Sequence, residues 1–186
     1  MQIQGRSLGQ AAQELVDRLN ALLNRTVTQK RLSLVLPRHA NEAQISFREH
    51  GVISPATLVT AYGRMDFDLR QVCDAVPGDE SGMLVLRTRA YRYTIRPEGA
   101  EEPLLRWEYV RFPADEDATW NRHHIQGPVA LGIRDRNGVE ATLNSWHTPT
   151  GAITVEDVLR FCITDLGVRP LHSDWHHLLR ETANAN

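Results

Sequence analysis

The sequence contains few residues that could cross-link the chain. Cys73 and Cys162 are its only cysteines, and neither belongs to a Cys-x-x-Cys pair. This excludes a disulfide scaffold, a zinc ribbon and a thioredoxin-like redox motif. Two reduced thiols are typical of a cytoplasmic protein, and we expect that location. A chain of 186 residues can bury a sufficient hydrophobic core without cross-links.

Long apolar runs and cofactor motifs are absent as well. No apolar run approaches the roughly 18 residues of a membrane helix, and the first ten residues lack the basic and apolar regions of a signal peptide. We therefore expect no membrane partner. Phosphate-binding Gly-x-x-x-x-Gly-Lys loops, dinucleotide-binding Gly-x-Gly-x-x-Gly motifs, Gly-x-Ser-x-Gly elbows and His-Glu-x-x-His metal motifs are missing. We expect no cofactor and no bound metal.

The charges nearly balance, with 21 basic and 23 acidic residues and a formal net charge of −2. This excludes binding of nucleic acid over the whole surface but leaves room for a local basic patch. Lys30 is the only lysine, so the basic residues are almost all arginine. Arginine excess has two explanations: a GC-rich coding sequence, or recognition of phosphate, whose oxygens match the guanidinium fork.

The N-terminal segment predicts an amphipathic helix over Leu8–Leu23. Ser7 is a suitable N-cap, and Gln10 three residues later completes a capping-box pattern. Apolar residues recur at helical spacing and form one stripe: Leu8, Ala11, Ala12, Leu15, Val16, Leu19, Leu22 and Leu23. The stripe must be buried, either on a sheet of the same chain or on a partner protein or second copy.

Up to the loop at residues 77–82 we expect two strands, Arg31–Leu36 and Ala43–Glu49, and two short helices. Ser54 followed by Pro55 is typical of a helix start, and Gly63 of its end. The stretch Met65–Ala75 is ambiguous, and we favour a helix.

After residue 82 the pattern predicts an antiparallel sheet. Met83–Arg96 and Leu104–Phe112 form a hairpin, followed by strands at His123–Ile133 and Val139–Trp146. Thr154 caps a helix that Gly167 ends, and a last helix covers Ser173–Thr182. The fold class is thus α+β: an antiparallel β-sheet with an N-terminal amphipathic helix and a C-terminal helix packed on it. Residues 1–80 form a helix and strand region, either separate or a layer of the same domain, and residues 81–182 the sheet with its C-terminal helix.

Histidines supply the candidate acid–base groups. His123 and His124 are adjacent on a predicted strand, so they point to opposite faces and at most one can join a given site. Pairing of the last two strands about Asn137-Gly138 places His124 opposite roughly Gly151, with His147 nearby. The alternatives are packed or exposed histidines, or a metal site built on His172 and His176, which are four residues apart.

Arginine alternates with aromatic residues on the predicted sheet. One face of the first hairpin strand would carry Arg87 and Arg89 together with Tyr91 and Tyr93, and Arg106 lies on the next strand. Cations for phosphate and rings for bases are typical of RNA-binding sheets. The alternative is a solvated outer face, because arginine often covers strand aromatics.

The order of motifs over about residues 85–166 resembles TumE-type toxins of prokaryotic toxin–antitoxin pairs. The likeness lies in four short stretches: Tyr91-Arg92-Tyr93, Leu105-Arg106-Trp107-Glu108-Tyr109, His123-His124 and Thr154-Val155-Glu156-Asp157-Val158-Leu159. In that family a tyrosine-rich hairpin leads to a histidine-rich strand and a closing helix. The first 80 residues have no counterpart there, and Gln126 stands where a second histidine of a His-x-His pattern would be. The resemblance implies a toxin-like or defence-associated prokaryotic protein.

Two hypotheses follow. The first is a metal-independent ribonuclease in which His124 or His123 is the general base and His147 the candidate acid. Its phosphate-binding residues would come from four arginines, Arg87, Arg89, Arg106 and Arg122, and Arg122 would also lower the pKa of the adjacent histidines. The second is a non-catalytic module that binds a ligand, RNA or a partner protein, working as a homo- or hetero-oligomer.

Overall fold

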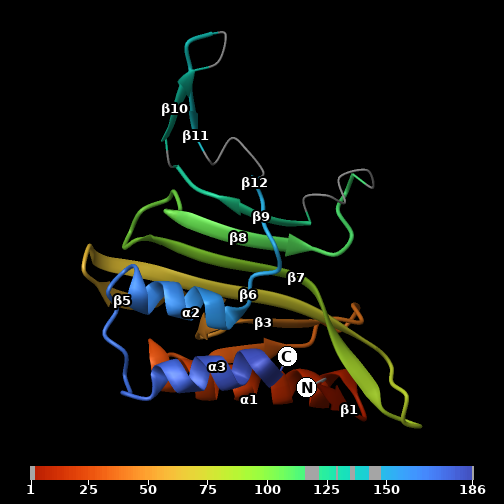
Figure 1. Ribbon diagram of the computed structural model, residues 1–186. Helices are drawn as coiled ribbons and strands as arrows, with labels where there is room; N and C mark the ends of the chain where they lie inside the picture. Colours follow the sequence, from red (N-terminus) through yellow and green to blue (C-terminus); the bar gives the residue numbers. More distant parts are fainter. Residues whose placement is uncertain (1–2, 116–121, 129, 135–136, 143–147, 186) are drawn as a thin grey trace.

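The computed structural model describes residues 3–115, 122–128, 130–134, 137–142 and 148–185. They form a large antiparallel sheet with the strand order β12-β9-β8-β7-β6-β3-β2, beside a small β10-β11 hairpin (Figure 1). β1, β4 and β5 pair with β7, β3 and β6. The strands are β1 (Gln4–Gly5), β2 (Leu32–Val35), β3 (Ala43–Glu49), β4 (Val52–Ile53), β5 (Ala56–Thr60), β6 (Gly63–Pro77), β7 (Leu84–Pro97), β8 (Leu105–Val110), β9 (His123–Gln126), β10 (Ala130–Arg134), β11 (Glu140–Thr142) and β12 (Thr148–Pro149).

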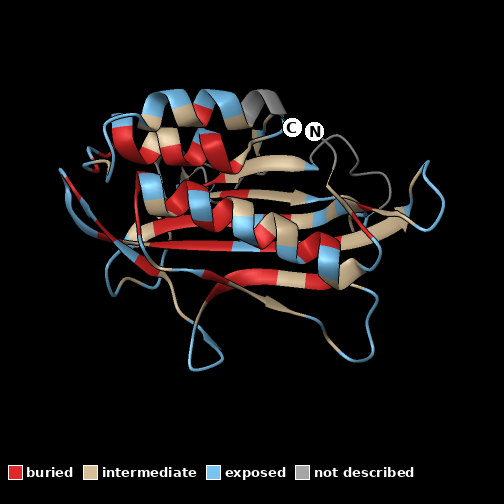
Figure 2. Cartoon of the chain, turned by 90° about the horizontal axis from the view of Figure 1, so that it is seen from below, coloured by how far each residue is buried: buried red, intermediate tan, exposed pale blue. Residues whose placement is uncertain are grey.

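The helices α1 (Leu8–Thr26), α2 (Val155–Thr164) and α3 (Trp175–Ala185) cover one face of the sheet (Figures 1 and 2). We call this the inner face and the opposite one the outer face. The predicted α+β class, with an antiparallel sheet and helices at both ends of the chain, is therefore confirmed. No described helix is long and apolar enough to cross a membrane.

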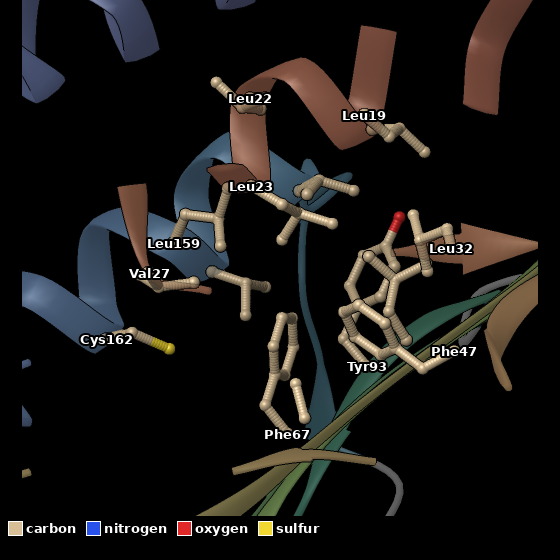
Figure 3. Packing of buried hydrophobic residues seen from close by; sticks show 14 of the residues in the cluster. Leu19, Leu22, Leu23, Val27, Leu32, Phe47, Phe67, Tyr93, Leu159 and Cys162 are labelled. Carbon is tan, nitrogen blue, oxygen red and sulfur yellow. The ribbon is translucent and has the colours of Figure 1, made fainter. Parts of the chain in front are cut away.

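The N-terminal helix begins as predicted and buries its stripe on its own chain. The Ser7 hydroxyl accepts a hydrogen bond from the Gln10 amide. Leu19, Leu22 and Leu23 belong to one core with Phe67 and Tyr93 of the sheet (Figure 3). The stripe that was a candidate surface for a partner is therefore covered within the chain.

Both short helices expected between residues 54 and 75 are wrong, because these residues form β5 and β6. Ser54-Pro55 precedes a strand: Ala56–Thr60 alternates between buried and exposed positions and pairs with β6. In β6, the buried residues Met65, Phe67, Leu69 and Cys73 recur at the two-residue period of a strand. Residue 80 lies in the loop between β6 and β7, and these two strands, one from each side of it, pair along almost their whole lengths in the same sheet.

A bulge in β7 changes which residues share a face. Val72 is paired with Ala90 and Cys73 with Thr88, so Arg89 is an extra residue on β7. Tyr91 and Tyr93 belong to the inner core, and Thr88 lines a cavity on the same face. Arg87 directly precedes Thr88 on the strand, so its side chain lies on the opposite face. The expected common face of Arg87, Arg89, Tyr91 and Tyr93 is therefore wrong.

The predicted strand at His123–Ile133 is divided at Gly127-Pro128. β9 joins the large sheet, whereas β10 pairs with β11. A Cβ at position 127 would lie 2.5 Å from the carbonyl oxygen of Leu104, so only glycine permits this close approach. His124 pairs with Pro149 rather than Gly151, a shift of two residues that leaves its face unchanged.

The hairpin of β7 and β8 and both C-terminal helices are confirmed. Thr154 caps α2 through a complete capping box with Asp157. This cap fixes the start of α2 beside the inner face, where Val155 and Glu156 line a cavity.

Candidate functional site

The two adjacent histidines lie on opposite faces of the sheet, as alternation predicts. β9 pairs with β8 so that His123 is opposite Tyr109 and His124 is opposite Glu108. His123 lines a cavity on the inner face, and His124 joins charged residues on the outer face. They cannot serve one active site together.

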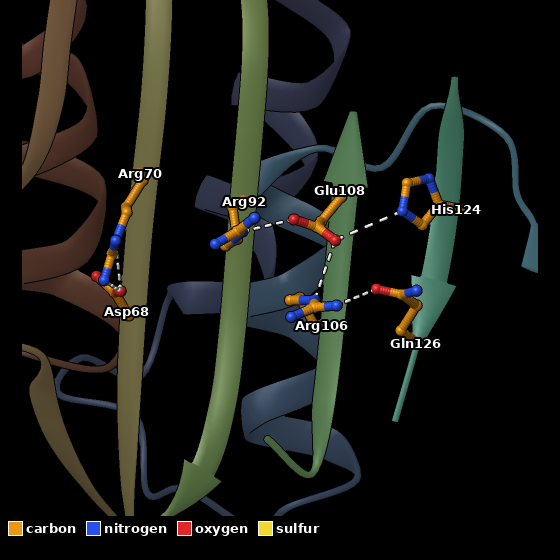
Figure 4. Close-up of polar contacts among 7 residues, drawn as sticks. All are labelled: Asp68, Arg70, Arg92, Arg106, Glu108, His124 and Gln126. Carbon is orange, nitrogen blue, oxygen red and sulfur yellow. Dashed lines mark hydrogen bonds and ion pairs between the residues drawn. The ribbon is translucent and has the colours of Figure 1, made fainter. Parts of the chain in front are cut away.

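Five residues of β7, β8 and β9 form what we call the outer charge cluster: Arg92, Arg106, Glu108, His124 and Gln126. Glu108 is central (Figure 4). Its Oε1 lies 2.5 Å from Arg92 Nε, and its Oε2 lies 3.0 Å from Arg106 Nε and 3.5 Å from His124 Nε2. Arg106 also donates to the Gln126 amide oxygen. The side chains of Glu108 and His124 are only 12% and 11% exposed, so these contacts are weakly screened by solvent.

More arginines extend the outer charge cluster along the same face. Arg70, opposite Arg92, pairs with the buried Asp68 at 2.6 Å. One Asp68 oxygen, Oδ1, has no hydrogen-bond partner among the residues that the structure describes. A small polar hollow of about 120 Å³ joins these groups. Its lining residues are Asp68, Arg70, Arg92, Thr94, Arg96, Glu101, Pro103 and Arg106. This surface offers several guanidinium groups to an anion.

The arginines predicted as one phosphate site are separated. Arg106 belongs to the outer charge cluster, but Arg87 lies 3.6 Å from Asp74 and Arg89 lies 3.3 Å from Glu42. Arg122 is exposed at the bend before β9. His147 lies outside the residues that the structure describes, so its role stays a prediction.

Sequence reasoning gave no role to Arg92 and Glu108. Alternation on β8 places Glu108 with Arg106, but the contact with Arg92 depends on the β7–β8 register, in which the two residues are directly opposite. A correct prediction of the β7–β8 register would have placed Arg92 and Glu108 opposite each other.

On the inner face, His123 is hydrogen-bonded to a tyrosine. Tyr91 Oη lies 3.1 Å from His123 Nδ1 and accepts a hydrogen bond from the Ile153 amide at 3.1 Å. The direction of this hydrogen bond depends on the tautomer of His123: when the phenol donates to Nδ1, neutral His123 carries its own proton on Nε2. Burial, and secondarily the charge of His124, lowers the pKa of His123. Arg122 is not among the causes, contrary to expectation.

Among the described residues, no group of three or more His, Cys, Asp or Glu side chains is arranged to hold a metal ion. His172 and His176 therefore do not form such a group with any described side chain. No family model, curated protein or solved structure matches this chain.

Proposed function

We propose that the protein is a toxin-like ribonuclease whose active site is the outer charge cluster. One observation carries the proposal: Glu108 contacts His124 and two arginines on a sheet face that the helices leave uncovered. A group that accepts a proton from the nucleophile, next to two guanidinium groups that stabilise negative charge, suits the cleavage of a phosphodiester bond. The resemblance to TumE-type toxins over residues 85–166 supports RNA as the substrate.

In this mechanism Glu108 orients His124 as the general base. His124 Nε2 lies 3.5 Å from Glu108 Oε2; in the proposed mechanism Nε2 carries a proton that faces this carboxylate, and Nδ1 acts as the basic nitrogen. Nδ1 takes the proton of an RNA 2′-hydroxyl as its oxygen bonds to phosphorus. The bond to the 5′ oxygen breaks, that oxygen takes a proton from water, and His124 later returns its proton to solvent. The products are a 2′,3′-cyclic phosphate and a 5′-hydroxyl.

Arg92 and Arg106 stabilise the charge that develops on the phosphate. Both already contact Glu108, which holds their guanidinium groups beside the base. Because every step uses side chains and water, cleavage proceeds in the presence of a chelator. Because the nucleophile is the 2′-hydroxyl, DNA is not cleaved.

The test is cleavage of a single-stranded RNA oligonucleotide by purified protein in EDTA, with an all-deoxy oligonucleotide of the same sequence as control. We expect RNA products ending in a cyclic phosphate. His124→Ala should slow cleavage by about 10²- to 10⁴-fold, and Arg92→Ala by roughly 10²-fold.

Two variants serve as matched controls. His177 is exposed on α3, and Arg87 is paired with Asp74 away from the outer charge cluster; His177→Ala and Arg87→Ala should cleave like wild type. Absence of cleavage by folded wild type, or equal rates in His124→Ala, would reject the proposal. RNA binding without cleavage would favour the binding-module hypothesis.

A further inference from the structure

A second candidate site lies on the inner face, between the sheet and the helices. It is a cavity of about 420 Å³, which falls within the roughly 300–1,000 Å³ typical of small-molecule sites. The residues that line it are Ile3, Leu15, Leu19, Gln71, Leu86, Thr88, Tyr91, Tyr93, Tyr109, His123, Ile153, Thr154, Val155 and Glu156. The proposed ribonuclease chemistry on the outer face uses none of them.

The cavity has an aromatic side and an aliphatic side. On the sheet, the rings of Tyr91 and Tyr93 stack with centroids 4.5 Å apart, and those of Tyr109 and His123 stack at 4.3 Å. Opposite them, α1 contributes Leu15 and Leu19, and other aliphatic side chains complete the lining. Apolar groups on both sides favour a flat apolar molecule.

Two polar groups of the lining, on Tyr93 and His123, are placed to pair with an occupant of the cavity. Tyr93 is only 3% exposed, and within the described part of the chain no residue hydrogen-bonds its hydroxyl. Figure 3 shows this side chain standing between the sheet and Leu19 of α1. His123 uses Nδ1 for Tyr91, which leaves Nε2 to pair with another group, as donor or acceptor according to the tautomer. The Tyr93 hydroxyl is not one of the fully buried polar atoms that lack a partner, so it borders the cavity and is open to pairing with an occupant.

The charge of the lining selects against anions. Among the described residues around the cavity, none is lysine or arginine, and the buried Glu156 is the one carboxyl group. An anionic molecule would lose its hydration without gaining a cationic partner, and it would lie near an acidic side chain. This excludes a phosphate group and separates the cavity from the proposed RNA site.

We propose that this cavity binds a small uncharged aromatic molecule that carries a hydroxyl or carbonyl group. Its ring system lies between the tyrosines of β7 and β8 and the leucines of α1. Its hydroxyl or carbonyl group pairs with His123 Nε2 or with the Tyr93 hydroxyl. The protein thereby has a ligand site on one face of the sheet and a polar, arginine-rich site on the other.

The test uses the full chain and two probes of equal shape, 2-naphthol and 2-naphthoate, in calorimetric titrations. We expect saturable binding of 2-naphthol at one site and at least about tenfold weaker binding of 2-naphthoate. In wild-type protein, 2-naphthol should shift the NMR signal of the His123 Cε1 proton, since this ring lines the cavity. Binding without that shift, or equal affinity for the two probes, would overturn the proposal.

Variants locate the site. Tyr93→Phe keeps the ring and removes the hydroxyl, and should weaken 2-naphthol binding by roughly 3- to 10-fold. Tyr62→Phe, at a tyrosine that is 73% exposed, should have no effect. Glu108→Gln alters the opposite face and should leave 2-naphthol binding unchanged. If Tyr93→Phe does not fold, the His123 shift in wild-type protein decides alone; absence of 2-naphthol binding to wild type refutes the proposal outright.

Discussion

At the scale of single residues, burial determines how His123 responds to pH. Burial lowers its pKa below 6.5 in the folded protein, while the unfolded chain keeps the ordinary value. Between these two pKa values the unfolded state binds more protons, so the contribution of His123 to stability rises with pH. This contribution to stability is lost as the pH falls from the pKa of the unfolded state to the lower pKa of the folded state.

We therefore expect His123→Phe, which retains an aromatic ring beside Tyr109, to lose part of the acid destabilisation of wild type. The measurement is the free energy of unfolding in urea from about pH 5 to about pH 7.5. His177→Phe, at an exposed position, is the control. Identical pH slopes for wild type and His123→Phe would contradict this account.

The two cysteines give a prediction about reactivity. Cys73 and Cys162 are both fully buried, and burial raises the pKa of each thiol to about 12. Since the thiolate is the reactive form, neither should react with Ellman's reagent in the native protein, and both should react in urea. Rapid reaction of either thiol before unfolding would show that the helix layer opens easily.

At the scale of elements, one side chain links α1 to the edge strand β2. Asn20 is 3% exposed; its Nδ2 donates to the Leu32 carbonyl at 3.1 Å, and its Oδ1 accepts from the Leu32 amide at 2.7 Å. Asn20→Ala would leave both buried backbone groups of Leu32 without partners. We expect a loss of about 2–4 kcal/mol in the free energy of unfolding.

Urea denaturation measures this loss, and hydrogen exchange should show weaker protection of the β2 amides. Gln13→Ala, on the exposed side of α1, should change stability by less than about 0.5 kcal/mol. If the two substitutions cost the same, the Asn20 contacts do not hold β2.

Local signals explain which elements the sequence predicts. The caps Ser7 and Thr154 act within one turn of their helices, so α1 and α2 are predicted correctly. Ser54-Pro55 gave a wrong helix prediction because the same pair can precede a strand. The pairing of β5 with β6 makes this segment a strand. The bulge at Arg89 depends on the partner strand, which no local pattern reveals.

The same distinction applies to the candidate site. Alternation alone separates His123 from His124 and places Arg106 with Glu108. The contact of Arg92 with Glu108 needs the β7–β8 register, and the Tyr91–His123 bond needs three strands in order. Residues joined across strands were therefore missed, whereas residues joined along one strand were found.

At the scale of the whole molecule, all three helices lie on one side of the sheet, which gives its two faces different chemistry (Figure 2). The inner face holds the hydrophobic core and the cavity. The outer face carries partly exposed arginines that pair with largely buried carboxylates. The outward side of α1 is polar, with Gln10, Gln13 and Asp17 exposed. The exposed side of α1 therefore has no apolar stripe, like the one that the helix buries, on which a second copy of the chain would pack.

With a net charge of −2, the salt dependence of RNA binding reflects how many phosphates a local basic patch contacts. A protein without overall positive charge can attract RNA only through a local patch, here Arg92 and Arg106 of the outer charge cluster. Each phosphate contact to a single strand contributes a slope of about −0.7 in a plot of log K against log salt concentration, so two contacts predict about −1.4.

Fluorescence anisotropy with a 2′-deoxy oligonucleotide, which binds without being cleaved, measures this slope. Arg92→Ala should reduce it to about −0.7, whereas Arg87→Ala should leave it unchanged. A wild-type slope steeper than about −4 would mean that RNA contacts an extended basic surface, and the outer charge cluster would then be only one part of the interface.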